Sequence, residues 1–460
     1  MELSSAAADL PTEALSSPGL KAVLSLLEEA VLVGGGGRPR GTRAVPSAGA
    51  AYPYEFAAIV MEGGQPSAFR IDADRRHCTR LASGARVATC LNSSGIALPR
   101  DGGAVVITLV RPWLSMRKYG DRGYLYTQLD AGHAVGNILV ASAGRGAPGV
   151  LRARFPRNPL TELLEVTENF REVHSAVVLG RVAARPLEGT WTMHDGTGQA
   201  HREATWQSWL ERACWESLAA RPARPGAPET AAMPSPLIGL LPRTRLRQEG
   251  AGLGEPGTWP GLLAARASSK AFVGNPVPAD DIWRAVSALA TPVLTDLPDT
   301  SALAATLVVR SASEADQNGV HPLTREGRRG GRLPSGEEMA KACMQQRTLT
   351  GAAAVVLLHA PRTALEDTSE HGPNRAAGTE AGNFGELALR CGALGQMLYL
   401  GAARAGIGVT GIGGFDAAMW RSLAGLPDSD DILYVLLLGK PDDSGIKLDR
   451  LGAAIAQNEQ

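Results

Sequence analysis

The sequence predicts an α+β fold made of two similar halves, fused into an intramolecular pseudo-dimer. The chain is 460 residues long, more than one domain usually needs, and one stretch of its first half returns in the second. That repeat sets LDAGHAVGNILVASAGRGAPG against LRCGALGQMLYLGAARAGIGV, and the halves end alike, in AVVLGR and VLLLGK. A fused duplication of this kind is a covalent version of a two-fold dimer.

The first half reads as helix, strands, long helix and strand. Apolar residues at helical spacing predict a helix over 20–30, which the glycines at 34–37 end. Short continuous apolar runs rich in β-branched residues predict buried strands at 55–61 and 104–110. The small residues of 128–143 predict a long helix packed tightly on its neighbours, and 174–180 gives the closing strand.

The second half repeats this order. It predicts a helix after Trp259, a charged helix after Pro278, strands at 304–309 and 352–358, a long small-residue helix over 383–405 and a last strand at 432–438. The Pro-rich composition of 184–258 predicts a linker that surrounds one helix near 201–220. The expected division is a flexible leader over 1–19, halves over 20–183 and 259–442, the linker over 184–258 and a tail over 443–460.

Charge and cysteine content exclude several classes of function. Lys+Arg and Asp+Glu both total 46, so the net charge is zero and neither a nucleic acid nor an anionic membrane is an expected partner. Scattered cysteines and the lack of an H-x-x-x-H motif predict neither a metal site nor a disulfide framework. With no signal peptide and no apolar window near 18 residues, a cytoplasmic protein is expected.

Lysine is scarce, which draws attention to RASSKAF at 266–272. Only six of the 46 basic residues are lysines, and Lys270 is one of them. Arg266, Ser268 and Lys270, at spacings of two residues, can converge on a phosphate, with the guanidinium as a fork and the ammonium as a point charge. The alternative is a solvated basic helix end that interacts favourably with the helix dipole.

Two stretches of small residues favour a flat ligand. The glycines of GIGGF at 411–415 let the backbone approach a planar ring and aim N–H groups at it, although an ordinary turn after a helix has the same composition. The segment RAVPSAGAAYP at 43–53 is flanked by prolines and suits a rigid loop lying against a ring.

Together these segments resemble a known family. RASSKAF is similar to the R-x-S-x-[RK]-x-F signature of the nitroreductase superfamily, and PSAGAAYPYEF resembles the S-A-G-A-x-Y-P segment of its SagB-type branch. RKYGDRGYLYTQLDAGH at 117–133 resembles the K-Y-G-x-R-G-Y block of that branch. The resemblance covers most of 20–183 and 259–442. Members of the branch are FMN-dependent dehydrogenases that oxidise thiazolines and oxazolines in ribosomal peptides.

The resemblance implies one composite FMN site per chain. In nitroreductase dimers the flavin lies at the subunit interface, where one subunit supplies the phosphate-binding residues, a Gln or Asn, the glycine turn and a terminal cation, and the other supplies the Pro-Ser loop. Here the first half keeps only the loop and the K-Y-G block, and the second keeps the rest. The implied FMN-binding residues are Pro46, Ser47, Ala48, Gly49, Arg266, Ser268, Lys270, Gln346, Gly411, Ile412, Gly413, Gly414 and Lys440.

The resemblance to the Lys-Tyr pair of the branch implies that Lys118 and Tyr119 are the catalytic pair. A lysine partly desolvated beside Arg117 and Arg122 would have a lowered pKa and could take a proton, while Tyr119 orients or relays it. Which of the two is the base stays open, and the alternative is that Lys118 is an exposed charge and Tyr119 a packing residue. His133 is expected to support or pack.

The expected function is oxidation of thiazolines or oxazolines to azoles in a ribosomal peptide, for example a thiopeptide. A base takes the proton, hydride goes to FMN, and oxygen re-oxidises the flavin. The resemblance implies an azoline-containing precursor peptide and cyclodehydratase proteins as partners, with the chain a monomer or a homodimer. The alternatives are an NAD(P)H-dependent nitroreductase acting on small molecules and a flavin-free scaffold subunit of a peptide-modifying complex.

Overall fold

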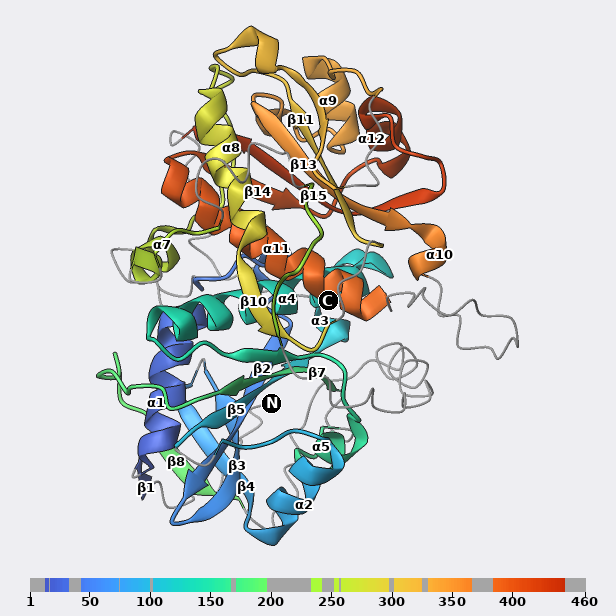
Figure 1. Ribbon diagram of the computed structural model, residues 1–460. Helices are drawn as coiled ribbons and strands as arrows, with labels where there is room; N and C mark the ends of the chain where they lie inside the picture. The colour runs from blue at the N-terminus through green and yellow to red at the C-terminus, as the bar shows by residue number, and fades with distance from the viewer. Residues whose placement is uncertain are drawn as a thin grey trace, which may run out of the picture.

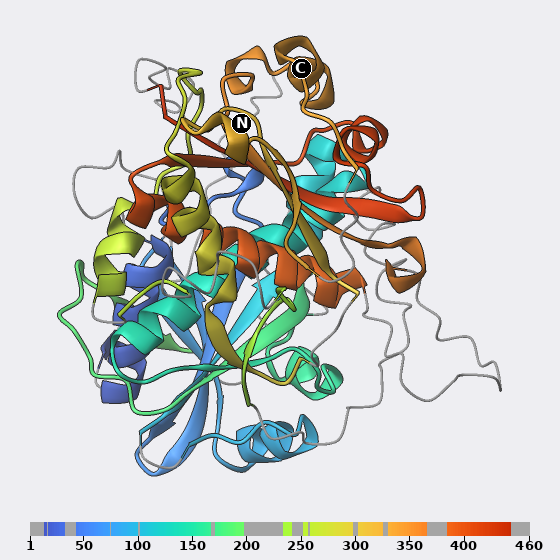
Figure 2. The same cartoon turned by 45° about the horizontal axis from the view of Figure 1, so that its top comes forward.

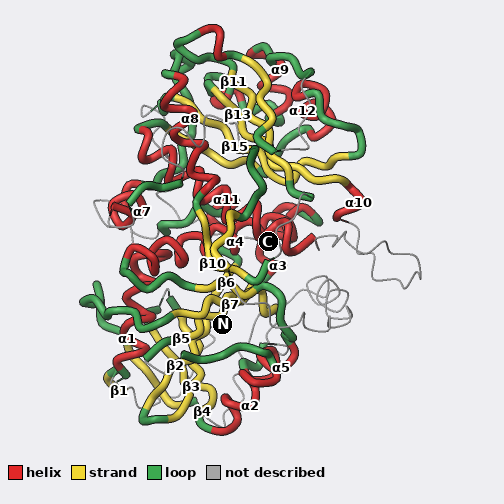
Figure 3. Tube along the Cα trace, viewed as in Figure 1, coloured by secondary structure: helices red, strands yellow, loops and turns green. Residues whose placement is uncertain are grey.

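The computed structural model places two β-sheets at opposite ends of the molecule, with the long helices α4 and α11 crossing between them (Figure 1). The same arrangement is seen in the view of Figure 2, and the tube in Figure 3 separates the two strand-rich ends from the helical middle. The structure describes residues 13–15, 17–32, 43–73, 75–99, 102–166, 171–196, 233–241, 252–255, 258–297, 302–324, 330–365 and 384–442.

The first sheet has ten strands in the order β1-β8-β4-β3-β2-β5-β7-β6-β10-β9. Its centre is made of buried antiparallel strands, as the continuous apolar runs predict. The strands are β1 (Glu13–Ala14), β2 (Tyr54–Glu62), β3 (Gln65–Asp72), β4 (His77–Ser83), β5 (Ala104–Val110), β6 (Val150–Arg152), β7 (Glu172–Leu179), β8 (Thr192–Asp195), β9 (Met233–Pro236) and β10 (Pro292–Thr295).

The helices of the first half cover both faces of this sheet and lead to the middle of the molecule. They are α1 (Pro18–Leu27), which continues as a π-helical turn over Glu28–Leu32, and α2 (Ala85–Ser93), α3 (Pro112–Tyr119), α4 (Arg122–Gly144) and α5 (Asn158–Leu163). The helix α1 begins where the Ser17 side chain accepts a hydrogen bond from the backbone N–H of Leu20. The apolar residues of α1 are buried against the core.

The second sheet has five strands in the order β12-β11-β13-β15-β14, all neighbours antiparallel. The strands are β11 (Ala304–Val309), β12 (Gly319–Pro322), β13 (Ala354–Pro361), β14 (Gly408–Ile412) and β15 (Asp430–Gly439). The helices of this half are α7 (Trp259–Ala265), α8 (Ala279–Ser287), α9 (Gly336–Ala342), α10 (Arg362–Leu365), α11 (Phe384–Ala405) and α12 (Ala417–Ala424).

The helices α4 and α11 cross at two glycines. A Cβ added to Gly132 would lie 2.5 Å from the Leu389 carbonyl oxygen and 2.9 Å from the Gly392 Cα, and one added to Gly392 would lie 2.8 Å from the Gly132 Cα. Any larger residue would push the two backbones apart. The sequence-based expectation of a tightly packed small-residue helix is confirmed, and this crossing brings side chains of the two halves together.

The expected elements that fall on described residues are confirmed, with differences at their borders. The long first helix starts six residues earlier than predicted, at Arg122, so the K-Y-G block spans the junction of α3 and α4. The end of the expected leader is ordered, because Glu13 and Ala14 pair with β8.

The expected linker is partly built into the fold. Its strands β8 and β9 join the ten-stranded sheet, and the Trp191 side chain donates a 2.8 Å hydrogen bond to Glu28. The predicted helix near 201–220 and the tail over 443–460 lie outside the described residues. Within the described part of the chain, no helix is both long and apolar enough to cross a bilayer.

Candidate active site

A cavity of about 440 Å³ lies between the two halves, beside the crossing of α4 and α11. Its volume falls within the range of small-molecule sites, and its wall mixes aromatic, hydroxyl and backbone groups. It is lined by Pro46, Ser47, Ala48, Gly49, Tyr119, Tyr126, Leu129, Asp130, Ser268, Ser269, Lys270, Gln346, Leu349, Tyr399, Thr410, Gly411, Ile412, Gly413, Gly414 and Tyr434.

The first half contributes the small-residue loop Pro46–Gly49, and the backbone is strained just after it. Gly49, Ala50 and Tyr52 have φ angles of 58°, 55° and 45°, a region that residues with a side chain rarely adopt. A Cβ on Gly49 would collide with the Tyr119 hydroxyl and lie 2.5 Å from the Lys118 Nζ. Glycine is therefore required here by backbone conformation and by the approach of the predicted catalytic pair.

Asp130 of α4 binds this loop through hydrogen bonds to Ser47 and Ala48. Its carboxylate accepts a 2.5 Å hydrogen bond from the Ser47 hydroxyl and bonds of 3.2 and 3.3 Å from the Ala48 N–H. The Ser47 oxygen in turn accepts from the Tyr52 N–H at 2.8 Å. Asp130 is buried, and burial raises the pKa of its carboxyl to about 7 even though the bonds from Ser47 and Ala48 lower it.

The second half contributes the segment after α7, with Arg266 behind the wall and Ser268 on it. The buried Arg266 donates to the Ser268 hydroxyl at 3.2 Å, and its guanidinium lies 5.4 Å from the Tyr399 ring centroid. Ser268 donates to the Tyr399 hydroxyl at 3.2 Å, and that hydroxyl accepts from the Gly411 N–H at 2.9 Å. These bonds tie the RASSK segment to the glycine turn at the end of β14.

The glycine turn is closely packed against aromatic rings. A Cβ on Gly411 would collide with the Tyr434 side chain, and one on Gly413 would collide with the ring of Tyr126. Arg122 donates to the carbonyl of Gly413 at 3.3 Å. The turn can keep this close approach only because it lacks side chains there.

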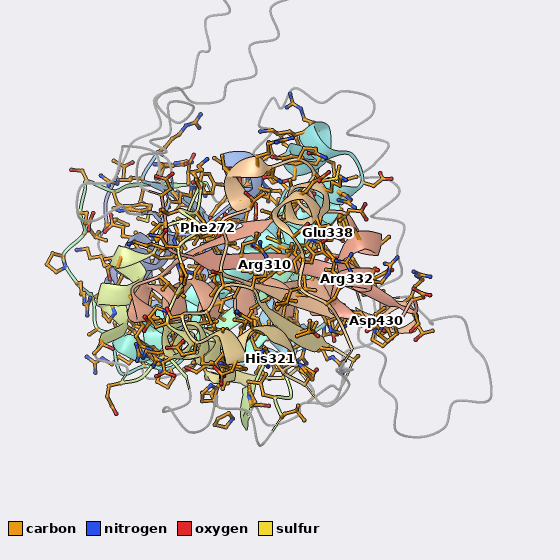
Figure 4. All side chains as sticks on the ribbon, turned by 90° about the horizontal axis from the view of Figure 1, so that it is seen from above. Phe272, Arg310, His321, Arg332, Glu338 and Asp430 are labelled. Atoms are coloured by element: carbon orange, nitrogen blue, oxygen red, sulfur yellow. The ribbon has the colours of Figure 1, made fainter. Side chains whose placement is uncertain are left out.

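Gln346 lies on a second strained turn at the cavity. Met344 and Gln345 before it have φ angles of 53° and 63°, and the Gln346 amide donates to the carbonyls of Cys343 at 3.0 Å and Gly414 at 3.3 Å. The following residues are fixed by Arg310, which donates to the carbonyls of Thr350 and Ala352, both at 2.9 Å. Figure 4 labels Arg310, which follows strand β11 of the five-stranded sheet, and Phe272.

A directed chain of hydrogen bonds supports Tyr434 across both halves. Burial lowers the pKa of His133 to about 3, so its ring is neutral, donating from Nδ1 to Gln396 at 3.0 Å and accepting from the Tyr434 hydroxyl at Nε2, 2.9 Å away. Gln396 donates to Asn137 at 2.5 Å, and Asn137 donates to the Ala30 carbonyl at 2.7 Å. His133 therefore supports the wall, as expected from the sequence.

The structure gathers most of the predicted site residues around one cavity and leaves three of them out of its lining. Pro46 to Gly49, Tyr119, Ser268, Lys270, Gln346 and Gly411 to Gly414 line the cavity. Arg266 lies behind Ser268, and Lys440 is exposed, its carbonyl bonded by the Val273 N–H. Lys118 reaches Gly49 but is exposed, so the expected desolvation of this lysine is wrong in this structure.

Eight wall residues were not predicted from the sequence: Tyr126, Leu129, Asp130, Ser269, Leu349, Tyr399, Thr410 and Tyr434. Tyr126 and Asp130 lie within the K-Y-G block, whose length was a signal that more than two of its residues serve the site. Tyr399 and Tyr434 read as core residues of a helix and a strand, and no local pattern marks them.

The residues present fit an FMN molecule. The glycine turn, where a Cβ would meet aromatic rings, and the small-residue loop leave a cleft for a planar ring. Lys270 and the hydroxyls of Ser268 and Ser269 form a donor set suited to a phosphate, and Gln346 adds an amide. An interfacial cavity with this donor set is compatible with a flavin nucleotide.

Comparison with known proteins finds a family match in the second half of the chain. Residues 263–440 match the model of the nitroreductase family. A nitroreductase-like protein of Methanocaldococcus jannaschii is 29% identical over 135 residues, which cover 28% of this chain and 67% of that protein.

The fold extends over both halves. The crystal structure of a nitroreductase-like protein from Anabaena variabilis aligns with 94% of this chain and 90% of its own, with a TM-score of 0.63 and 17% identity. The α+β nitroreductase-like fold is therefore shared by nearly the whole chain.

Proposed function

We propose that this protein binds one FMN in the cavity between its halves and oxidises thiazoline or oxazoline rings of a ribosomal peptide to azoles. The observation that carries the proposal is the meeting of Gly49 with Lys118 and Tyr119. The small-residue loop and the K-Y pair are the two segments that resemble the azoline-oxidising branch, and here they form one wall opposite the segment that matches the nitroreductase family.

The cofactor would be held mainly by the second half. Lys270 and the neighbouring serine hydroxyls would bind the phosphate, with Arg266 adding positive charge from behind and Lys440 from the exposed edge. The glycine turn and Gln346 would face the ring system on one side, and Pro46–Gly49 would face it on the other. Bound FMN would supply the acceptor for a hydride that leaves the substrate ring.

The chain's own groups would manage the proton. Conversion of an azoline to an azole removes a proton from the ring carbon beside the carbonyl and a hydride from the neighbouring carbon. The Lys118 nitrogen and the Tyr119 oxygen both approach Gly49, so Lys118 as the neutral amine, or Tyr119 as the phenolate, can take that proton at the cavity edge. The T-shaped contact of Tyr119 with Tyr126, 5.1 Å between centroids, fixes the Tyr119 ring.

We also propose that the two halves arose by duplication and form a pseudo-dimer. Gly132 and Gly392 are matched in the repeat, and they face each other at the helix crossing. A Cβ on Gly132 would approach the Leu389 carbonyl and one on Gly392 the Leu129 carbonyl, and these leucines are matched as well. Reciprocal contacts of this kind are the mark of a two-fold interface.

A mass-shift assay tests the activity. FMN-loaded protein incubated in air with a thiazoline-containing peptide, without NAD(P)H, should lower the peptide mass by about 2 Da per ring, the mass of two hydrogen atoms. An unchanged mass with both thiazoline and oxazoline peptides, in protein shown to hold FMN, contradicts azoline oxidation.

A second function, NAD(P)H-dependent reduction of a small molecule, is favoured by the family match of residues 263–440. It predicts rapid bleaching of the flavin absorbance when NADPH is added under anaerobic conditions. A purified protein that cannot be loaded with flavin would instead indicate a scaffold subunit.

A further inference from the structure

Asp130 is a buried carboxylate placed under a strained loop. The residue is 4% exposed. It accepts hydrogen bonds from Ser47 and Ala48, which precede it in the chain by 83 and 82 residues. The loop ends at Gly49, and Gly49 and the following Ala50 lie in the left-handed region, a conformation that surrounding contacts have to maintain. The bonds to Asp130 are the contacts that fix its first turn.

The electrostatic surroundings of Asp130 leave its charge weakly compensated. Tyr54 of β2 and Tyr434 of β15 interact with it electrostatically, and both are buried and neutral because burial raises their pKa. No described Lys or Arg side chain contributes to the pKa shift of Asp130, whereas burial moves that pKa close to neutrality. The other charged or titratable groups around the cavity are Arg43, Lys118, Tyr119, Arg122, Tyr126, His133, Arg266, Lys270 and Tyr399.

We propose that Asp130 is the positioning residue that holds loop Pro46–Gly49 in its flavin-facing shape, and that ionisation of its carboxyl tightens this hold. The inference rests on the proposed function in taking a flavin as the ligand that the loop faces. A carboxylate accepts stronger hydrogen bonds than a neutral carboxyl group, so the Ser47 and Ala48 bonds strengthen when the proton leaves. The hydrogen bonds that fix the conformation of the loop are therefore stronger above neutral pH than below it.

The direction of the pH dependence follows from the sign of the shift. The pKa of Asp130 in the folded protein is raised from 3.8 to about 7, so the carboxyl loses its proton as pH rises through neutrality. Flavin affinity should therefore increase between pH 6 and pH 8. The gain from replacing neutral by charge-assisted bonds is about three- to tenfold in affinity.

Riboflavin is the suitable probe, because the phosphate of FMN itself titrates near pH 6. Riboflavin binding to the full chain is followed by fluorescence quenching at pH 6, 7 and 8. We expect the wild-type dissociation constant to fall by about three- to tenfold over this range and that of Asp130→Asn to change by less than about twofold. Equal pH dependence in the wild type and Asp130→Asn would overturn the inference.

Asp296→Asn is the matched control. Asp296 is also buried with a raised pKa, and it accepts hydrogen bonds from two consecutive N–H groups, those of Ala153 at 2.9 Å and Arg154 at 3.2 Å, but it does not line the cavity. This variant should keep the wild-type pH dependence. Loss of the pH dependence in Asp296→Asn as well would contradict a specific role for Asp130.

Ser47→Ala keeps the inference testable if Asp130→Asn does not fold. Removing the Ser47 hydroxyl takes away a bond that stabilises the carboxylate, so the midpoint of the pH dependence should move to higher pH. An unchanged or lower midpoint would overturn the inference.

Hydrogen exchange of the flavin-free chain separates this inference from the proposed function. Corrected for intrinsic rates, protection of the backbone amides of residues 44–53 should rise between pH 6 and pH 8 in the wild type and stay constant in Asp130→Asn. A chain that fails to bind any flavin but shows this rise would contradict the proposed function and support the role of Asp130. Protection that does not depend on pH would contradict the role of Asp130 whatever the chain binds.

Discussion

Asp130 of α4 and Arg390 of α11 hold matching positions in the internal repeat, and each bonds a segment from outside its own helix. Asp130 bonds Ser47 and Ala48 beside the cavity. Arg390 is buried and donates at 3.0 Å to the carbonyl of Leu237, which is itself buried. The same helix position thus borders the cavity at Asp130 and packed core at Arg390. We call the surroundings of Asp130 the open side and those of Arg390 the closed side.

The turns that follow the two helices differ in the same way. In the register of the repeat, Gly413 and Gly414 match Ala153 and Arg154. The glycines line the cavity, whereas the N–H groups of Ala153 and Arg154 are taken by the carboxylate of Asp296. On the closed side, the Asp296 carboxylate and the buried Leu237 occupy the surroundings of the turn and of Arg390. On the open side, the matched positions border the cavity. Under the proposed duplication, one site is kept and the matched one is filled by local substitutions.

Lys118→Ala should produce the largest effect on the open side. If Lys118 takes the substrate proton, turnover falls by about 10²- to 10⁴-fold while FMN stays bound. Azole formation measured by mass spectrometry, together with flavin absorbance, checks this. Lys341→Ala, which removes an exposed lysine paired with Glu337, is the control and should leave turnover unchanged. Full turnover in Lys118→Ala would contradict the assignment of Lys118 as the base and leave Tyr119 as the candidate.

Arg266→Ala should weaken FMN binding by about ten- to a hundredfold. Loss of one charge-assisted contribution at the phosphate costs about 1.5–3 kcal/mol, and 1.4 kcal/mol is a factor of ten in affinity. Fluorescence titration with FMN and with riboflavin measures the loss, which should be confined to FMN because riboflavin has no phosphate. A variant that keeps its yellow colour through dialysis would show that Arg266 does not serve the phosphate.

Arg390→Met should act on stability alone. The change leaves the buried Leu237 carbonyl without its bond from Arg390, at a cost of about 1–3 kcal/mol in the free energy of unfolding. Urea unfolding measures this cost, and FMN titration of the folded variant should match the wild type. Weaker FMN binding with unchanged stability would mean that the closed side contributes to the cofactor site.

The sequence predicts the fold well because its strongest signals are local. The apolar runs of β5 and β11 and the small residues of α4 and α11 set their structure without reference to distant residues. The site is predicted in part, since Ser47, Lys270 and Gly413 lie in recognisable short segments.

What the sequence does not predict depends on tertiary contacts. Asp130 gains its raised pKa from burial under a loop more than eighty residues away, and Tyr434 becomes a wall residue through its bond to His133. The exposure of Lys118 is likewise set by where α3 ends, at the junction with α4.

The number of flavins bound per chain tests the central claim most directly. The purified protein is saturated with FMN, freed of excess by gel filtration and denatured, and the released flavin is measured against protein concentration. One cavity between the halves, with the matched region closed by Asp296 and Leu237, predicts one FMN per chain. Two FMN per chain, or none after saturation, would contradict the account.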